Sequence, residues 1–366
     1  MKSILHIMDY AAPYEGNFIP SIKNLEDHLN KLGWRLIYLF PKATEKTEWV
    51  KLLLNGGKTI YFIDSSFFAK KIKYYNIKYL NWIIRKESIN IIHTHFVAYN
   101  YSLAILKNFF LHKVKVVGSF LNEFYPPFNK YRKIKIFLTK ISFDLIIGCS
   151  QAVVKSLSDA GISPKKLSCI NNALDIKHLQ HSEILSINNY PDQKVVLMFG
   201  WPYTRKGVDN GIEAIKLLNA EGGNYLLAIE IPGLPSLIEN EILAQLGTIP
   251  SWIKFLKPRN DVTSYFNAAD VFLSASREEG LAYSVLEAAY CNPMLVVSAI
   301  GGHAQDIPHT AIYEVEDIEK LKKSISDICS LSDEQRILIK KAQREYVIKA
   351  YDLDDWSKSI IKCYLK

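Results

Sequence analysis

Short runs of β-branched and aliphatic residues alternate with segments of helical periodicity along the whole chain. Segment Ser21–Leu32, for example, carries apolar residues at helical spacing and is followed by Gly33, a common end for a helix. Such alternation is typical of parallel sheets built from βαβ units, so the pattern predicts an α/β protein.

The same rhythm runs through both halves of the chain and predicts a series of strands in each. In the first half these are Ser3–Met8, Trp34–Phe40, Thr59–Ile63, Ile89–His93, Lys115–Ser119, Leu145–Cys149 and Lys166–Asn171. In the second half they are Lys194–Phe199, Tyr225–Ile231, Ile253–Leu256, Val271–Leu273, Leu295–Ser298 and Ile312–Glu314, with helices at Val208–Leu218 and Tyr283–Tyr290. Two doubly wound sheets in succession would place a ligand in the crevice at the carboxyl ends of the strands.

The length of 366 residues is about twice that of a usual domain, which agrees with two Rossmann-like domains. We expect them at 1–180 and 190–348, joined by the polar stretch His178–Gln193. A C-terminal helix at about 350–366 has Trp356 and Tyr364 on an apolar face that could pack back on the first domain.

Composition and charge narrow the class of protein further. The five cysteines are far apart and form no CxxC pair, which favours reduced thiols in the cytosol over a disulfide framework. The start of the chain has no signal-peptide pattern, and no apolar run is long enough for a membrane span. Residues 1–190 hold 26 Lys/Arg against 13 Asp/Glu, a net charge of +13, whereas the remainder holds 19 against 24, or −5. A basic half suggests an anionic partner.

The segment richest in chemistry follows the predicted strand Val271–Leu273. It reads Ser276-Arg-Glu-Glu-Gly280 and continues through Leu281, Ala282 and Tyr283 to Glu287. A strand-to-helix turn at Gly280 would direct backbone N–H groups of residues 281–283 at a diphosphate. Glu287, one turn into the helix, could accept hydrogen bonds from two ribose hydroxyls. An acidic helix N-terminus favoured by the macrodipole is the alternative interpretation.

Several further motifs occur in order around this segment. They are Asn172-Ala-Leu-Asp175, Phe199-Gly200 with Lys206-Gly207, Asn260-Asp-Val262, and Ala268-Ala-Asp-Val-Phe-Leu-Ser274. Together with Ser-x-x-Glu-Gly…Leu-Glu-Ala…Pro…Gly-Gly they resemble the family-4 retaining glycosyltransferases, the Glu-x7-Glu group of the GT-B fold. The resemblance covers roughly residues 145–305 and is thinner before that. It implies a transfer of sugar from a nucleotide diphospho-sugar, UDP-linked rather than GDP-linked.

The resemblance implies roles for individual residues of the second half. Glu279 would position the donor sugar and support positive charge at its anomeric carbon. Lys206 matches the lysine that binds the donor diphosphate. Trp201 stands where the family usually has Arg, and Arg205 would supply the missing charge; alternatively, Arg205 and Lys206 are a solvated pair at a helix start. The nucleoside would lie against Glu287 and the loop Lys257–Arg259, including Arg259.

The first half departs more from the family pattern. The family usually has two glycines in its first loop, and this chain has one of them, Gly16. It would allow the donor or acceptor to approach the backbone closely. His93 and His95 follow the apolar run Ile89–Ile92 at its carboxyl end, so His95 is expected at the cleft edge; a purely structural role for this pair is the alternative. Leu121 occupies the position where the family often has a histidine that touches the donor sugar. Either Asn122 or Glu123 takes over that contact, or the acceptor binds differently.

The expected partners follow from the charge and the resemblance. The segment Phe128–Ile141 mixes cations with apolar residues, which is typical of either an interfacial helix on anionic lipid or a surface helix with a buried apolar stripe. We therefore expect a glycan or lipid-linked acceptor, in cell-surface polysaccharide or glycoconjugate synthesis, and a cytoplasmic protein, peripheral at the inner face of the membrane. No nucleic-acid motif accompanies the charge, and neither a metal nor another cofactor is expected.

Two other classes of function stay open at this point. Leu121, Trp201 and the single Gly16 also suit a GT-B subunit that binds glycan or a partner glycosyltransferase without catalysis. A GT-B epimerase or phosphorylase is the weaker alternative, because the chain has neither signature.

Overall fold

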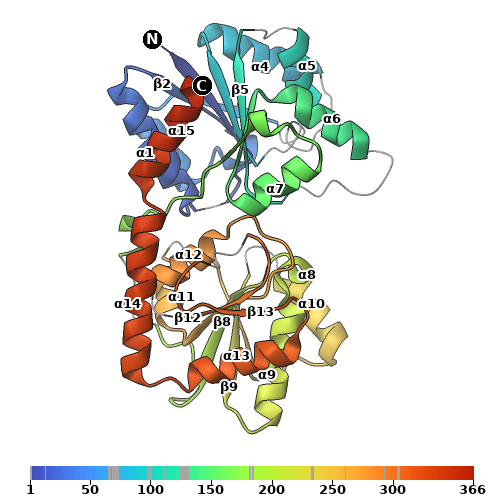
Figure 1. Ribbon diagram of the computed structural model, residues 1–366, viewed down its shortest axis with the longest axis vertical. Coiled ribbons are helices and arrows are strands. Elements are labelled where there is room, and N and C mark those ends of the chain that lie inside the picture. Colours follow the sequence, from blue (N-terminus) through green and yellow to red (C-terminus); the bar gives the residue numbers. More distant parts are fainter. Residues whose placement is uncertain are drawn as a thin grey trace. The chain divides into compact units, whose positions relative to one another are not determined.

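The computed structural model describes the whole chain except residues 1, 13, 65–66, 68–73, 97–100, 110–112, 124–131, 181–182, 184, 232–234, 260, 292 and 303–305. The chain divides into two compact units, which are treated separately below. The first contains Met1–Ala173 and Leu353–Lys366, and the second contains Leu174–Asp352 (Figure 1). The polar stretch His178–Gln193 therefore belongs to the second unit. Of the sequence motifs above, Asn260 and Phe128–Tyr131 lie outside the described residues.

The first unit is built on a seven-stranded parallel sheet with the order β3-β2-β1-β4-β5-β6-β7. Its strands are buried almost throughout, as expected where helices cover both faces. They are β1 Ser3–Met8, β2 Arg35–Pro41, β3 Ile60–Ile63, β4 Ile91–His95, β5 Lys115–Phe120, β6 Leu145–Gly148 and β7 Leu167–Cys169.

The helices of the first unit include one from the opposite end of the chain. They are α1 Phe18–Lys31, α2 Glu48–Asn55, α4 Tyr74–Lys86, α5 Tyr101–Phe109, α6 Arg132–Ser142, α7 Gln151–Asp159 and α15 Leu353–Leu365. Figure 1 shows α15 beside α1, and its Ile360 and Tyr364 are buried in the same core as Ile22 and Leu25 of α1. Each such buried apolar side chain stabilises by roughly 1.5–3 kcal/mol, so α15 is an integral part of this unit.

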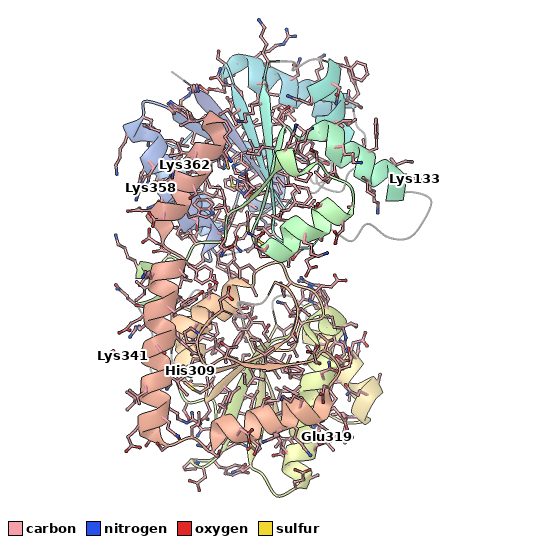
Figure 2. All side chains as sticks on the ribbon, in the orientation of Figure 1. Lys133, His309, Glu319, Lys341, Lys358 and Lys362 are labelled. Atoms are coloured by element: carbon pink, nitrogen blue, oxygen red, sulfur yellow. The ribbon has the colours of Figure 1, made fainter. Side chains whose placement is uncertain are left out.

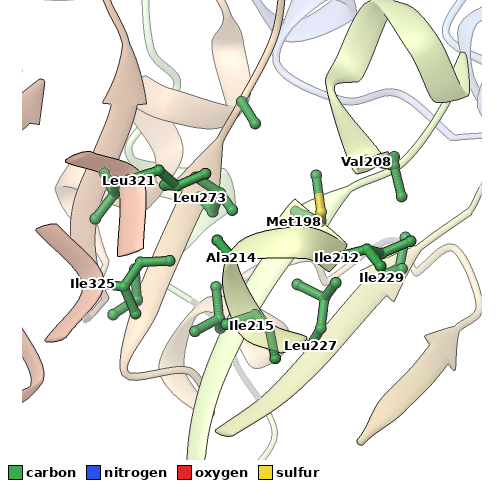
Figure 3. Packing of buried hydrophobic residues seen from close by; sticks show 14 of the residues in the cluster. Met198, Val208, Ile212, Ala214, Ile215, Leu227, Ile229, Leu273, Leu321 and Ile325 are labelled. Carbon is green, nitrogen blue, oxygen red and sulfur yellow. The ribbon is translucent and has the colours of Figure 1, made fainter. Parts of the chain in front are cut away.

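The second unit repeats the architecture with six parallel strands in the order β10-β9-β8-β11-β12-β13. The strands are β8 Lys194–Phe199, β9 Tyr225–Glu230, β10 Ile253–Leu256, β11 Val271–Ser274, β12 Met294–Ser298 and β13 Ala311–Tyr313. The helices are α8 Tyr203–Lys206, α9 Val208–Ala220, α10 Pro235–Leu246, α11 Thr263–Asn267, α12 Tyr283–Tyr290, α13 Ile318–Cys329 and α14 Asp333–Ala350. The core between α9, α13 and the sheet is aliphatic, with Ile212, Leu227 and Leu273 among its members (Figure 3).

The fold class predicted from the sequence is confirmed: both units are doubly wound parallel α/β structures. Predicted strand bounds agree within one or two residues, with the largest shift at β4, which was expected at Ile89–His93 and runs instead over Ile91–His95. Among the described residues, no helix is both long and apolar enough to cross a membrane.

Candidate functional site

The loop between β11 and α12 carries a buried carboxylate in contact with a lysine. Glu279 is 7% exposed, and its Oε1 accepts a hydrogen bond from Lys206 Nζ at 2.5 Å and from Ser276 Oγ at 3.2 Å. The guanidinium of Arg205 lies 3.9 Å from Oε2 of the same carboxylate. A buried ion pair of this kind costs desolvation energy, so its two partners are held near each other by the surrounding structure.

Close backbone packing brings Lys206 to this loop. Gly207 has a φ of +63°, and a Cβ at this position would lie 2.0 Å from the carbonyl oxygen of Ala275, so only glycine fits. The Arg277 N–H donates to the carbonyl oxygen of Arg205 at 2.8 Å. The segment after β8 and the segment after β11 are therefore joined through their main chains.

Arg277 is a residue of this site that sequence reasoning missed. Its guanidinium donates to Asp209 at 2.8 and 2.9 Å, to Glu316 at 2.6 Å and to the carbonyl oxygen of Thr204. It thereby connects α8 and α9 to the loop that carries Glu279. The signal was present in the sequence as a cation inside the Ser-x-x-Glu-Gly motif, but its partners lie far away along the chain.

The cations Arg205 and Lys206 lie in the last turn of the short helix α8, and α9 begins after Gly207. The alternative of a solvated pair at a helix start is therefore wrong. Cations at a helix C-terminus interact favourably with the macrodipole. Trp201, in the preceding loop, is 40% exposed.

The start of α12 has the strand-to-helix geometry that the sequence predicted. Gly280, Leu281 and Ala282 are buried in the loop, and the helix begins at Tyr283. Glu287 lies in the second turn of α12 and is 7% exposed. Its charge helps burial to raise the pKa of the Cys291 thiol to about 12.

The loop after β10 holds Arg259 in a fixed position. Its guanidinium donates to Asp261 at 2.7 and 3.0 Å and to Glu183 at 2.5 Å. Tyr265 supports the same loop, because its hydroxyl donates to the carbonyl oxygen of Lys257 at 2.8 Å. The Arg259 guanidinium is therefore hydrogen-bonded to two carboxylates, those of Asp261 and Glu183.

In the first unit, Gly16 adopts a left-handed φ of +54°. The Tyr10 hydroxyl donates to the carbonyl oxygens of Tyr14 and Glu15 at 3.0 and 2.9 Å, which closes the loop around Gly16. Asn122 and Glu123 follow β5 directly, and the Asn122 side chain is exposed. The segment around Gly16 and the segment after β5 are both loops, as the sequence predicted.

His95 is not at an open strand edge, contrary to expectation. It lies within β4 and is 1% exposed, and its Nε2 is 3.1 Å from Nδ1 of His6. His6 Nε2 and His93 Nδ1 both contact the Tyr364 hydroxyl, at 3.0 and 2.6 Å, and His93 Nε2 contacts Ser119 Oγ at 2.7 Å. Burial lowers the pKa of His6 to about 3, and the pKa values of His93 and His95 lie well below their usual range.

These three histidines are close enough to be considered as metal ligands, since their ring nitrogens all lie within 4.8 Å of one another. Both ring nitrogens of His6 and of His93 already have hydrogen-bonding partners, however. The group is therefore best described as a buried hydrogen-bond network, which extends from Ser119 through Tyr364 to His95. It fixes the C-terminal helix α15 to the sheet of the first unit.

This network predicts that the protein loses stability in mild acid. The three histidines have depressed pKa values when folded and ordinary values near 6.5 when unfolded. Their contribution is complete above pH 6.5 and is lost as the pH falls toward the folded values, by up to about 1.4 kcal/mol per pH unit for each histidine. The urea concentration at the midpoint of unfolding should fall steeply for the wild type as the pH is lowered from 7.5 to 6 and 5. The fall should be less steep for His93→Gln. The same substitution at the partly exposed His178 serves as control, and a flat wild-type profile would contradict the network.

Two family models match the chain. The model of Glycosyl transferases group 1 matches residues 182–345, which include the whole Lys206–Glu279 site, and that of Glycosyltransferase Family 4 matches residues 21–178. The chain is a glycosyltransferase, whose two halves match these two models. It is therefore an enzyme of the transferase class with the GT-B fold, in agreement with the interpretation of its motifs.

Curated relatives are distant in sequence, and the share of this chain that they cover differs widely. The phosphatidylinositol N-acetylglucosaminyltransferase GPI3 subunit of Saccharomyces cerevisiae is 21% identical over 95% of this chain and 80% of its own length. A Campylobacter jejuni enzyme, N,N'-diacetylbacillosaminyl-diphospho-undecaprenol alpha-1,3-N-acetylgalactosaminyltransferase, is 25% identical over 53% of this chain and 50% of its own. Lipopolysaccharide glucosyltransferase WaaG of Escherichia coli is 30% identical, over 31% of this chain and 30% of its own.

Solved structures confirm the fold over the full chain. Anabaena HepE in complex with UDP and glucose superposes with a TM-score of 0.77 at 15% identity, covering 100% of both chains. A glycosyltransferase of Rickettsia africae gives a TM-score of 0.76 at 18% identity, covering 99% of this chain and 97% of its own.

Proposed function

We propose that this glycosyltransferase moves a sugar, with retention, from a nucleotide diphospho-sugar to a hydroxyl of a glycan or lipid-linked glycan, in cell-surface polysaccharide or glycoconjugate synthesis. The contact of Lys206 Nζ with the buried Glu279 carboxylate carries the proposal. It puts a cation for the departing diphosphate next to an anion for the reacting sugar, at the carboxyl ends of β8 and β11.

The proposed reaction breaks the bond between the anomeric carbon and the diphosphate oxygen. The acceptor hydroxyl oxygen bonds to that carbon, and its proton passes to the departing nucleoside diphosphate. Lys206, Arg205 and the N–H groups at the start of α12 would stabilise the charge on the leaving group. Glu279 would stabilise the positive charge that develops on the sugar, and Glu287 would bind the ribose.

A UDP-sugar is the donor we favour over a GDP-sugar. The support is that HepE, whose fold this chain shares along its full length, binds UDP and glucose according to the description of its structure. Because two side-chain cations face the proposed diphosphate, we also expect turnover without a metal or another cofactor. No nucleic-acid partner is proposed.

A panel of nucleotide sugars, tested for thermal shift and for hydrolysis in the presence and absence of EDTA, tests this proposal. We expect one donor to raise the unfolding temperature and to be turned over slowly by water, with EDTA having no effect. Binding without turnover of any donor would instead support the non-catalytic alternative. The absence of both binding and turnover across UDP-, GDP- and dTDP-sugars would overturn the proposal.

We further propose that the enzyme is cytoplasmic and peripheral at the inner face of an anionic membrane, through α6. Ile134 and Phe137 of α6 are 45% and 58% exposed, and Phe109 at the end of α5 is 72% exposed. Lys133 projects from the same helix (Figure 2). Apolar side chains flanked by cations are typical of a helix that lies on anionic lipid. The names of two relatives include a lipid, phosphatidylinositol in one and undecaprenol in the other. These names support the proposal of a lipid-linked acceptor.

Vesicle flotation tests the membrane proposal. The enzyme should float with vesicles containing phosphatidylglycerol and stay behind with pure phosphatidylcholine. Lys133→Glu combined with Phe137→Ser should abolish flotation, whereas Lys341→Glu on the exposed face of α14 should not. Equal flotation of wild type and double variant would show that α6 is not the contact.

A further inference from the structure

A third carboxylate lies at the carboxyl edge of the second sheet, and neither the motifs nor the mechanism above uses it. Glu230 is the last residue of β9, in the middle of three adjacent parallel strands. It pairs with Phe199 of β8 on one side and with Leu256 of β10 on the other. The Gly200 N–H donates to its carbonyl oxygen at 2.9 Å. The residue thus lies between the loop that leads to Lys206 and the loop that carries Arg259.

The Glu230 carboxylate is buried, and within the part of the chain that the structure describes no donor is hydrogen-bonded to it. The residue is 8% exposed. Burial disfavours the ionised form of a carboxylate and raises the pKa of Glu230 to about 7, although the positive charge of Lys206 opposes this shift.

The charged and titratable groups around Glu230 come from each of the elements that surround it. Burial raises the pKa of Tyr265 in α11; the positive charge of Arg259 opposes this shift and the charge of Glu230 adds to it. Lys206 in α8 attracts the carboxylate, and Lys206 in turn contacts Glu279. The remaining groups are Arg205 beside Lys206, and Arg259 and Asp261 beyond Tyr265.

We propose that Glu230 is a proton-linked positioning residue of the donor site: its carboxyl takes up a proton when a diphosphate binds beside Lys206, and its ionised form opposes donor binding. This inference rests on the proposed function of the site. A diphosphate brings two negative charges toward Lys206, and an ionised Glu230 would both repel them and compete for the lysine. Protonation removes the repulsion, and the neutral carboxyl can then donate a hydrogen bond within the site.

The expected signature is a donor affinity that depends on pH. Binding that takes up one proton weakens by up to about tenfold per pH unit above the pKa of the group that accepts it. The wild-type enzyme should therefore bind donor more weakly as the pH rises from 6.5 to 8.5. Glu230→Gln keeps the shape of the side chain and has no titrating group, so its donor affinity should be nearly constant over this range.

The test is isothermal titration calorimetry with UDP-glucose and GDP-mannose, whose diphosphate diesters keep their charge between pH 6.5 and 8.5. Titration at pH 8 in two buffers of different ionisation enthalpy gives the number of protons taken up. We expect nearly one for the wild type and for Glu345→Gln, a matched change at an exposed position of α14, and none for Glu230→Gln. A thermal unfolding curve for Glu230→Gln checks that the fold is retained.

Two outcomes would overturn the inference and leave the donor site intact: a wild type that binds donor without a pH dependence, or a Glu230→Gln variant that keeps the wild-type dependence. If neither nucleotide sugar bound to wild type or variant at any pH while the broader donor panel also failed, the proposed function itself would be refuted, and this inference with it.

Discussion

Replacement of Glu279 by alanine is expected to lower kcat for sugar transfer by roughly 10²- to 10³-fold. The reason is that its buried carboxylate contacts Lys206, which we propose to bind the diphosphate. Its charge would act on the sugar as positive charge develops at the anomeric carbon. Steady-state rates with the donor identified by the nucleotide-sugar panel provide the measurement. Donor binding should fall much less than kcat, because Lys206 remains available to the diphosphate.

The neighbouring residue supplies a matched control for this experiment. Glu278 is exposed, so Glu278→Ala changes the same net charge one position away and should retain wild-type rates. Glu279→Gln separates charge from shape, and it should be nearly as slow as Glu279→Ala. Wild-type kcat in Glu279→Ala, with an unchanged unfolding temperature, would refute the role proposed for this carboxylate.

Replacement of Gly302 by alanine is expected to displace the loop that carries Glu279. A Cβ at this position would lie 1.9 Å from the carbonyl oxygen of Glu279 and 2.3 Å from that of Gly280, far inside van der Waals contact. Because both contacts are with main chain, no side-chain rotation relieves them. The loop must move, and we expect a loss of activity of about 10²-fold or more, with destabilisation of about 1–3 kcal/mol typical of overpacking.

Thermal shift with the preferred donor and transfer rates measure the effect of Gly302→Ala. The stabilisation by donor should disappear together with activity, since both depend on the position of the loop. Gly56→Ala is the control, because its Cβ would lie 3.4 Å from carbonyl oxygens of α2, and it should behave like wild type. A Gly302→Ala enzyme that binds donor normally would show that the loop tolerates movement without consequence.

The positions of the candidate residues were only partly predictable from the sequence. The strand-to-helix turn at Gly280 and the helix from Tyr283 to Tyr290 could be recognised because the motif and the apolar period are local. The approach of Lys206 to Glu279 was expected from the resemblance, and the structure supplies its physical cause: Gly207 lets two strand-end segments pack main chain against main chain.

The histidines show where local reasoning failed. A predicted strand end at His93 placed His95 on an open edge, but β4 continues to His95 and both imidazoles are buried. The polar partners that make this burial tolerable are His6 of β1, Ser119 of β5 and Tyr364, which arrives from α15 at the other end of the chain. The hydrophobic pattern along the chain does not reveal hydrogen-bonding partners that lie so far away in the sequence.

The sequence by itself determined two doubly wound α/β units and the importance of the segment from Ser276 to Glu287, because hydrophobic period and local motifs are properties of neighbouring residues. The enzyme class was indicated by the resemblance of those motifs to known glycosyltransferases. Only the tertiary structure decided which side chains meet. Lys206 reaches Glu279 across 73 positions, and Arg277 reaches Asp209 across 68, because β8 and β11 are adjacent in the sheet. Glu230 lies on the same sheet edge because β9 is the other neighbour of β8 in the sheet. Strand order is set by packing of the whole domain, so the charges that share its carboxyl edge are not neighbours in the chain.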